Sequence, residues 1–218
     1  MGILGGTGPA GSGLGARLAA AGVTVTIGSR AKDRAQATCD GIHQRWPDRR
    51  LPLEAGDNAT AAAADVVVVA TPWDAAAATV ASVAHLLGGK VVISMANALA
   101  RVGNEFEPLV PPRGSVASHV QASAPGALVA AALHHLPAKE LGNLDHRVES
   151  DVLVCSDHAE ATRVTSDLVR LIPGCRPLDT GTLSNATPIE AFAAVLLQLN
   201  VRYRTRTAIR MTGIEMSE

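Results

Sequence analysis

The chain has 218 residues, a formal net charge of −1, 47% hydrophobic residues and only 2% aromatic residues. This length suits one compact domain, or a core with a modest second lobe. The near-neutral charge excludes a general electrostatic attraction to nucleic acid or to an anionic membrane, and the scarcity of aromatic side chains argues against base-stacking surfaces. We therefore expect no nucleic-acid partner and no membrane association.

The three cysteines, Cys39, Cys155 and Cys175, are far apart in the sequence and lack the spacing of metal ligands. An odd, scattered set of this kind predicts reduced thiols that pack in the interior, so we expect no metal site. The sequence shows no basic leader of a secretory signal, and no run reaches the roughly 18 apolar residues that a membrane span needs. These features predict a cytoplasmic protein.

The first thirty residues place a glycine-rich loop between a predicted strand at 2–4 and a predicted helix at 14–21. Gly6, Gly8 and Gly11 spell the motif G-x-G-x-x-G. In this context the glycines permit a tight turn and bring backbone N–H groups, at the positive end of a helix, close to a pyrophosphate. The motif predicts a dinucleotide site, and a glycine-rich surface loop is the plain alternative.

The end of the next predicted strand, 23–27, distinguishes NADP from NAD. A protein that binds NAD places Asp or Glu there, to accept hydrogen bonds from the ribose hydroxyls. This chain has Ser29 and Arg30, with Arg34 close behind, and no acid before Asp33. A guanidinium and a hydroxyl suit a 2′-phosphate, so the residues predict NADP. The alternative, a solvated charge run, is disfavoured because cations oppose the dipole at a helix start.

Strands and helices alternate through the first half of the chain. We predict strands at 51–53, 65–70 and 90–94, and helices at 33–45, 58–64 and 75–87. The β-branched run at 65–70 is typical of a parallel strand that is covered on both faces. The alternation predicts an α/β fold of the Rossmann type, with a doubly wound, mainly parallel sheet and right-handed connections.

In such a sheet a ligand lies across the carboxyl ends of the strands. That edge would bring the glycine loop together with the segments that follow the strands at 65–70 and 90–94. We expect these segments to contact the nicotinamide end of the cofactor through Thr71, Pro72, Trp73 and Asn97. For Trp73, a packing role at the start of a helix is an equally good interpretation.

The pattern loosens in the segment 101–113, which contains a glycine and three prolines. We interpret this segment as a loop or short helices, and as a lobe boundary. It divides the chain into a core at 1–113 and a smaller C-terminal lobe at 114–218, packed together as one unit. In the lobe we predict strands at 127–133, 151–155 and 176–179, and helices at 160–171 and 188–203.

No catalytic triad or metal motif is present in the sequence, and the one adjacent histidine pair is His134-His135. Adjacent residues on a strand point in opposite directions, so the two cannot chelate one metal. They precede a Leu-Pro-Ala turn where a second ligand could meet the nicotinamide. His134 is therefore interpreted either as a substrate contact or as a packing residue.

Several short blocks occur in the order seen in one family. They are Gly5-Gly6-Thr7-Gly8, Gly28-Ser29-Arg30, Thr71-Pro72-Trp73, 132–138 (Ala-Leu-His-His-Leu-Pro-Ala), Asn143-Leu144-Asp145, 151–155 (Asp-Val-Leu-Val-Cys) and 176–185, which begins Arg-Pro-Leu-Asp. The chain resembles the NADPH-dependent reductases of coenzyme F-420 (F420) over nearly its whole length. The glycine loop is common to many NADP enzymes, whereas the His-x-Leu-Pro-Ala and Arg-Pro-Leu-Asp blocks are more specific.

The resemblance implies reversible hydride transfer between NADP(H) and the deazaflavin co-substrate F420. The cofactors supply this chemistry, so no catalytic side chain is expected. The implied phosphate contacts are Thr7, Gly8, Pro9 and Ala10 beside Gly6, and the implied 2′-phosphate contacts are Ser29, Arg30 and Arg34. The implied deazaflavin-facing turn runs from His134 through Leu136 and Pro137 to Ala138, which makes 114–218 a deazaflavin-binding lobe. We also expect a homodimer.

Two segments depart from the family pattern. Residues 94–99 replace a segment that contains Pro and Val in archaeal members, and an arginine-rich tail replaces a more apolar one. If the last helix continues, Arg202, Arg206 and Arg210 lie on one face. Such a stripe could hold the phosphodiester and glutamate tail of F420, but a solvated or dimer-facing surface is the favoured interpretation.

Two other functions stay open at this point. One is an NADPH-dependent reductase of an imine, a ketone or a flavin. Many such relatives add a long helical dimerisation domain, for which no length is left after residue 200. The other is a non-catalytic NADPH sensor whose second lobe binds a partner protein.

Overall fold

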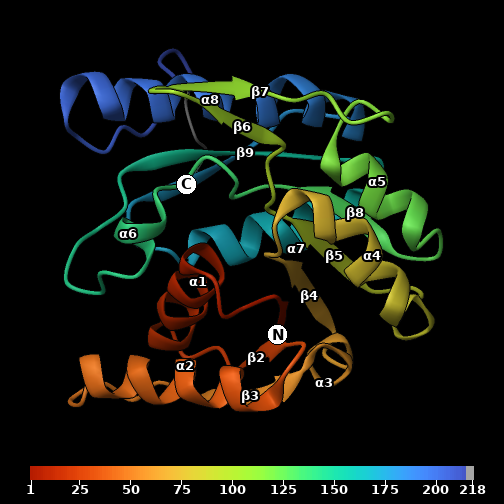
Figure 1. Ribbon diagram of the computed structural model, residues 1–218, viewed down its shortest axis with the longest axis vertical. Coiled ribbons are helices and arrows are strands. Elements are labelled where there is room, and N and C mark those ends of the chain that lie inside the picture. Colours follow the sequence, from red (N-terminus) through yellow and green to blue (C-terminus); the bar gives the residue numbers. More distant parts are fainter. Residues whose placement is uncertain (215–218) are drawn as a thin grey trace.

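A computed structural model describes residues 1–214 and places one mainly parallel sheet at the centre of the molecule (Figure 1). Among these residues the sheet has eight strands in the order β10-β9-β8-β5-β4-β1-β2-β3. Its strands are β1 (Gly2–Leu4), β2 (Val25–Ser29), β3 (Leu53–Asp57), β4 (Val66–Val69), β5 (Val91–Ser94), β8 (Leu128–Ala131), β9 (Ser150–Ser156) and β10 (Cys175–Asp179). Within this eight-stranded sheet of the described residues, only the β8–β9 pair is antiparallel. The predicted Rossmann-type α/β class is confirmed.

Helices cover both faces of this sheet. They are α1 (Pro9–Ala20), α2 (Lys32–Arg45), α3 (Asn58–Ala62), α4 (Trp73–Val83), α5 (Val116–Ser123), α6 (Ala138–Leu141), α7 (Ala159–Arg170) and α8 (Ala186–Tyr203), with short 3-10 turns at Ala84–Leu86 and Leu183–Asn185. Successive strand residues face opposite sides, so Val68 packs with α1, α2 and α7, whereas Val67 and Val69 pack with α4, α5 and α8. Both apolar clusters depend on small alanine side chains, which let the helices approach the sheet closely.

The third strand differs from the prediction, because it covers Leu53–Asp57 rather than 51–53. This strand lies at the edge of the sheet and pairs only with β2. An edge strand need not be apolar on both faces, and the sequence Leu-Glu-Ala-Gly-Asp therefore gives no strong hydrophobic signal. Leu51 is buried just before the strand, and this explains why the apolar residues there suggested an earlier start.

The segment 101–113 was expected to form a loop or short helices, and that expectation is wrong for its first part. β6 (Leu99–Val102) and β7 (Glu105–Pro108) form an antiparallel hairpin outside the main sheet, and β7 lies against α8 (Figure 1). Gly103 makes the turn with a φ of +62°. The glycine therefore marks a hairpin rather than a break, and Pro108 is tolerated because it stands at the end of a strand with one neighbour.

The α5 helix was not predicted, and its N-terminus is held by two acceptors. Ser115 Oγ accepts the N–H of Ser118 at 3.0 Å. The buried Glu190 carboxylate of α8 accepts the N–H groups of Val116 and Ala117 at 2.8 and 3.1 Å. Burial raises the pKa of Glu190 to about 7, although the two N–H groups act in the opposite direction. This contact joins two helices through residues that are 73 and 74 positions apart in sequence.

The last helix ends at residue 203 as predicted, so the condition under which Arg202, Arg206 and Arg210 would share one helix face is not met. The α8 helix ends at Tyr203 because Arg204 adopts the left-handed conformation, with a φ of +51°. Arg206 and Arg210 therefore lie beyond the helix, in a tail that folds back across the sheet edge. Arg206 pairs with Glu140 of α6. The last four residues of the predicted lobe, 215–218, lie outside the described chain.

A buried carboxylate anchors this tail. Asp151 of β9 accepts two hydrogen bonds from Arg176, both at 2.7 Å, and one from Arg210 at 3.0 Å. The N–H of Met211 donates to it at 2.6 Å. Burial alone would raise the pKa of Asp151, but these donors outweigh burial and lower the pKa to about 2. Arg206 and Arg210 of the tail therefore form intramolecular ion pairs with the body of the protein.

Candidate functional site

The glycine loop after β1 depends on two close approaches that exclude a side chain. Gly5 has a φ of +68°, and a Cβ there would lie 2.5 Å from Thr71 Cγ2. A Cβ on Gly11 would lie 2.9 Å from Gly6 Cα and 3.0 Å from Ala70 Cβ. The turn therefore requires Gly5, and the packing of α1 against the sheet requires Gly11.

The middle glycine of the motif differs from its neighbours. The nearest atom to a Cβ built on Gly8 is 3.9 Å away, so no protein atom forbids a side chain there. The N–H groups of Thr7, Ala10 and Gly11 have no hydrogen-bond partner within residues 1–214. The loop therefore presents open space and unpaired donors at the start of α1, which is the arrangement that binds a phosphate group.

A cleft of about 680 Å³ runs from this loop along the carboxyl edge of the sheet to α4. Eight residues predicted from the sequence line it, namely Thr7, Gly8, Pro9, Ser29, Arg30, Arg34, Thr71 and Pro72. Gly6 lies buried beneath the loop, where its N–H donates to Gly28 O at 2.8 Å. The structure thus brings together the glycine loop and the segments after β2 and β4.

Asn58 also lines the cleft, although the sequence analysis did not single it out. Its Oδ1 accepts the N–H of Gly5 at 3.3 Å and so supports the loop. The signal was present in the sequence, because Asp57 and Asn58 stand at the end of β3 as Ser29 and Arg30 stand at the end of β2. It was missed because β3 was placed too early.

The end of β2 carries an unneutralised positive charge. Ser29 is buried and its Oγ accepts the N–H of Ala31 at 3.4 Å, while Arg30 and Arg34 are exposed. Neither arginine makes an ion pair with any residue in 1–214. Two guanidinium groups and a hydroxyl are thus available to an anion at one end of the cleft.

Buried polar atoms without partners collect at the carboxyl ends of β4, β5 and β8. Within the described residues they include Thr71 Oγ1, Ser94 Oγ, Asn97 Oδ1 and both ring nitrogens of His134. Unpaired buried polar groups are rare in folded proteins and call for a partner such as water or a ligand. Asn97 Nδ2 donates to His134 O at 2.6 Å and so joins the end of β5 to the turn at 132–138.

The two histidines of this turn belong to the interior. Burial lowers the pKa of His134 to about 3, with a smaller contribution from His135, so the imidazole is neutral at pH 7. The Nε2 of His135 lies 2.8 Å from Asp151 O. Leu136 is buried, whereas Pro137 and Ala138 are partly exposed. The accessible edge of the turn is therefore its last two residues.

Not all predicted residues share one cavity. Trp73 lines a separate cavity of about 230 Å³ with Pro112 and His119, and it packs against the apolar core. Pro137 and Ala138 line two grooves on either side of α6. Asn97, His134 and Leu136 line none of these spaces, and Ala10 lies beside the cleft on α1. A ligand contact from Trp73 and from the turn residues stays a prediction.

Glycine and arginine hold α6 against α1. A Cβ on Gly13 would lie 3.0 Å from both Ala138 O and Gly142 N, so any side chain there would push α6 away by a few tenths of an ångström. Arg17 is 3% exposed and donates to four carbonyl oxygens of the α6 segment, those of Glu140, Leu141, Asn143 and His146. The helix that presents the glycine loop therefore also fixes the turn at 132–138.

The cysteines are protonated at neutral pH, and the acidic residues of the described chain are not grouped into a metal site. Burial raises the pKa of Cys39 and Cys155 to about 11, and that of Cys175 to about 12, so these thiols stay protonated at neutral pH. Within residues 1–214, no three His, Cys, Asp or Glu side chains are grouped to hold a metal ion. No helix of that part of the chain has the length and hydropathy of a membrane span.

A Rossmann-type sheet that has unpaired N–H donors for a phosphate after β1 and unpaired cations after β2 defines a protein of the NADP-binding class. Residues 1–98 match the family described as "NADP oxidoreductase coenzyme F420-dependent". The F420-dependent NADP reductases of Methanocaldococcus jannaschii and Methanothermobacter thermautotrophicus are 35% and 34% identical, over 98% and 99% of this chain and 98% and 96% of theirs. A putative F420-dependent NADP reductase from Arthrobacter has a TM-score of 0.78 and 25% identity, over 96% of this chain and 98% of its own. The chain belongs to the F420-dependent NADP reductase family.

Replacing Arg17 with methionine tests the link between α1 and α6. We expect Arg17→Met to lower the free energy of unfolding by about 3 kcal/mol, because four carbonyl groups lose a charged donor. Urea denaturation followed by circular dichroism measures the change. Arg163→Met, which removes an exposed ion pair of 3.2 Å on α7, should cost less than about 0.5 kcal/mol. A loss from Arg17→Met as small as this control would show that the carbonyl contacts contribute little.

Proposed function

We propose that the protein catalyses reversible hydride transfer between NADP(H) and F420. The observation that carries this proposal is the identity to curated F420-dependent NADP reductases over nearly the full length of both chains. The cleft supports the same conclusion independently, because it combines open phosphate donors with unpaired cations. The lobe at 114–218 would contribute the deazaflavin side and the core at 1–113 the NADP side. Because β8, β9 and β10 continue the sheet of the core, we regard the two as one rigid unit.

The NADP contacts follow from the arrangement of the cleft. The open space over Gly8 and the N–H groups of Thr7 and Ala10 would hold the pyrophosphate, with Gly6 and Pro9 shaping the loop. Ser29, Arg30 and Arg34 would hold the 2′-phosphate. The phosphate would be attracted to this region because two guanidinium groups there have no ion-pair partner within the described residues.

The nicotinamide end would reach the unpaired polar atoms at the carboxyl ends of β4 and β5. Thr71 Oγ1 and Asn97 Oδ1 lack partners within the described chain, and a carboxamide or ribose hydroxyl can satisfy such groups. Pro72 closes this part of the cleft. Trp73 would contact the cofactor only from its own cavity beside α4, so a packing role accounts better for its position.

The deazaflavin would lie against the turn at 132–138. The N–H groups of Ala138 and Lys139 have no partner in residues 1–214, and Pro137 and Ala138 form the accessible edge. The neutral imidazole of His134 would support this edge from behind, together with Leu136. A small residue at position 138 leaves room for a flat ring.

The chemistry needs orientation rather than an acid or a base. When bound, the nicotinamide and deazaflavin rings supply the hydride donor and the hydride acceptor. The residues of the chain would align the two rings and keep water away from them. The neutral state of His134 and the protonated cysteines agree with a site that has no catalytic side chain.

We further propose a cytoplasmic homodimer. Apolar side chains are exposed on α8 and on the nearby hairpin, namely Phe192, Val195, Val201, Tyr203 and Val102. A second copy of the chain would cover them. The three cysteines are free thiols, as expected in a reducing compartment.

Mixing the protein with NADPH and F420 tests the proposed function. We expect the absorbance of the oxidised deazaflavin to fall at a rate proportional to the enzyme concentration. The absorbance should return when NADP is added in excess to reduced F420. Binding of NADPH without bleaching would contradict the proposal. A screen of imines, ketones and flavins would then separate another reductase from a non-catalytic NADPH sensor.

Reversing the charge at Arg30 tests the 2′-phosphate contact. We expect Arg30→Asp to weaken NADPH about 30-fold, because a phosphate loses a guanidinium and meets a carboxylate, and to weaken NADH less than about threefold. Equilibrium titration of cofactor fluorescence measures both. Lys32→Asp makes the same charge change next to the cleft, outside its lining, and should affect NADPH much less. Equal losses for NADPH and NADH would show that Arg30 does not contact the phosphate.

A further inference from the structure

The first part of β9 has no strand beside it on the side of β8. Among the described residues, β8 pairs only with the last two residues of β9, and the segment 132–138 then leaves the sheet. Two other segments supply the missing partners. The N–H of Asp151 donates to Ile209 O of the C-terminal tail (204–214) at 2.7 Å, and its carbonyl oxygen accepts a hydrogen bond from His135 Nε2 at 2.8 Å. Asp151 is thus the residue at which β9, the tail and the turn at 132–138 meet.

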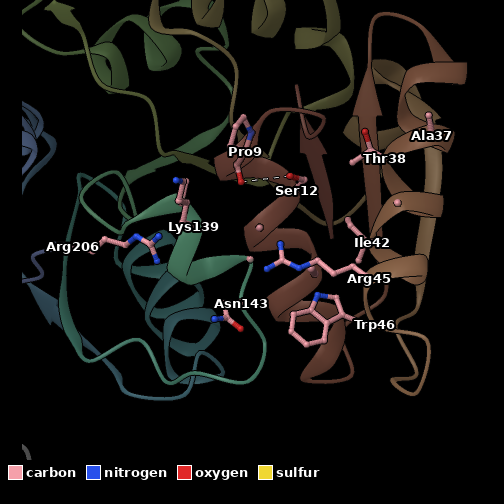
Figure 2. Close-up of a pocket in the computed structure, with 15 residues that line it drawn as sticks. Pro9, Ser12, Ala37, Thr38, Ile42, Arg45, Trp46, Lys139, Asn143 and Arg206 are labelled. Carbon is pink, nitrogen blue, oxygen red and sulfur yellow. Dashed lines mark hydrogen bonds between the residues drawn. The ribbon is translucent and has the colours of Figure 1, made fainter. Parts of the chain in front are cut away.

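Two arginines and a buried side chain hold the tail in place. Arg206, which Figure 2 shows beside α6, pairs with Glu140 of that helix. Arg210 donates to the Asp151 carboxylate at 3.0 Å, and Ile209 packs in the apolar core. The tail therefore contacts both the backbone and the side chain of Asp151, and this residue is itself fully buried.

The backbone of the turn at 132–138 needs support from its surroundings. Leu133 is buried and has a φ of +69°, a left-handed conformation that a residue with a Cβ adopts only when other contacts hold it. In the described chain, the bond from His135 to Asp151 O is the one hydrogen bond made by a side chain of this turn. The ring of His135 also packs edge-to-face against that of His134, with the centroids 5.4 Å apart.

The chemistry of this bond fixes the form of His135. A carbonyl oxygen can only accept, so the imidazole carries its proton on Nε2. Burial lowers the pKa of His135, and the ring therefore stays a neutral donor at pH 7. The link between Asp151 and the turn is thus present throughout the neutral range.

We infer that Asp151 and His135 are positioning residues for the hydride transfer: the tail fixes Asp151, and Asp151 fixes the turn at 132–138 through His135. This inference rests on the proposed function, which places the deazaflavin against the accessible edge of that turn. Neither residue is among those that line the NADP cleft or the grooves beside α6, so each acts through the turn rather than on a ligand. Their effect is to hold Pro137 and Ala138 at the spacing that aligned rings require.

Two substitutions of His135 separate its hydrogen bond from its bulk. His135→Phe keeps a ring but removes the donor, and Asp151 O still accepts the Ser150 hydroxyl at 2.9 Å, so no buried carbonyl is left unpaired. His135→Gln offers an amide donor in place of the imidazole. In single-turnover stopped-flow measurements with NADPH and F420 both saturating, we expect His135→Phe to transfer hydride about tenfold more slowly than wild type, and His135→Gln to stay within about threefold of it. The NADPH affinity of both variants should stay within about twofold of wild type, because the turn does not line the NADP cleft.

A third substitution tests the contribution of the tail without changing the turn. Arg210→Met removes one cation from Asp151, whose carboxylate keeps both hydrogen bonds from Arg176. We expect hydride transfer to slow about fivefold at unchanged NADPH affinity. Arg147→Met is the matched control, because Arg147 also pairs with Glu149, at 3.0 Å, but makes no ion pair with Asp151. This control should transfer hydride at the wild-type rate, and circular dichroism shows whether each variant is folded.

The outcomes distinguish a positioning role from a merely structural one. A folded His135→Phe or Arg210→Met protein that transfers hydride at the wild-type rate would overturn the inference, even if its free energy of unfolding is lower. His135→Gln that is as slow as His135→Phe would also overturn it, because the hydrogen bond would then not be what holds the turn. If the proposed function itself is wrong, the wild-type protein does not reduce F420 at all, whereas failure of this inference alone leaves wild type and variants equally active.

Discussion

The structure depends most on how closely α1 approaches its neighbours. Because Gly11 has no side chain, the helix packs against the glycine loop and against Ala70, which follows β4. Because Gly13 has none, the helix packs against α6, where a Cβ would lie 3.0 Å from backbone atoms. Arg17 then fastens the α6 segment through four carbonyl contacts. One helix thus presents unpaired N–H groups at its N-terminus, where a phosphate would bind, and its side packs against the segment of the proposed deazaflavin turn. The absence of side chains at Gly11 and Gly13 would therefore set the distance between the two proposed ligand sites.

Charge is distributed to match this arrangement. The cations at the end of β2 are unpaired within the described chain and face the cleft, whereas Arg206 and Arg210 of the C-terminal tail are paired with Glu140, Glu149 and Asp151. The first set would recognise a ligand, and the second set fastens the tail to β9 and α6. Five of the buried polar atoms without partners, on Thr71, Ser94, Asn97 and His134, lie at the ends of β4, β5 and β8. An enzyme that moves a hydride between two rings needs this kind of frame more than it needs an acid or a base.

The sequence predicts the fold and the phosphate end of the site because both depend on local patterns. Each of these patterns spans only a few consecutive residues: the glycine motif, the β-branched run at 66–69 and the pair Ser29-Arg30. Other features depend on contacts between distant segments. The hairpin at 99–108 depends on support from α8, the end of α8 depends on one left-handed residue, Arg204, and the role of Arg17 depends on carbonyl groups more than 120 residues away. No periodicity reveals such contacts, and the edge strand β3 was misplaced because an edge needs little hydrophobicity.

The most direct test of this account adds one methyl group where α1 meets α6. Gly13→Ala should push Ala138 and Gly142 away by a few tenths of an ångström, and Gly88→Ala, whose Cβ would meet no atom within 4 Å, is the matched control. In a single-turnover stopped-flow measurement, we predict that Gly13→Ala transfers hydride from NADPH to F420 about tenfold more slowly, with NADPH affinity within about twofold of wild type. A folded Gly13→Ala protein that transfers hydride at the wild-type rate would contradict the claim that this contact sets the spacing of the two rings.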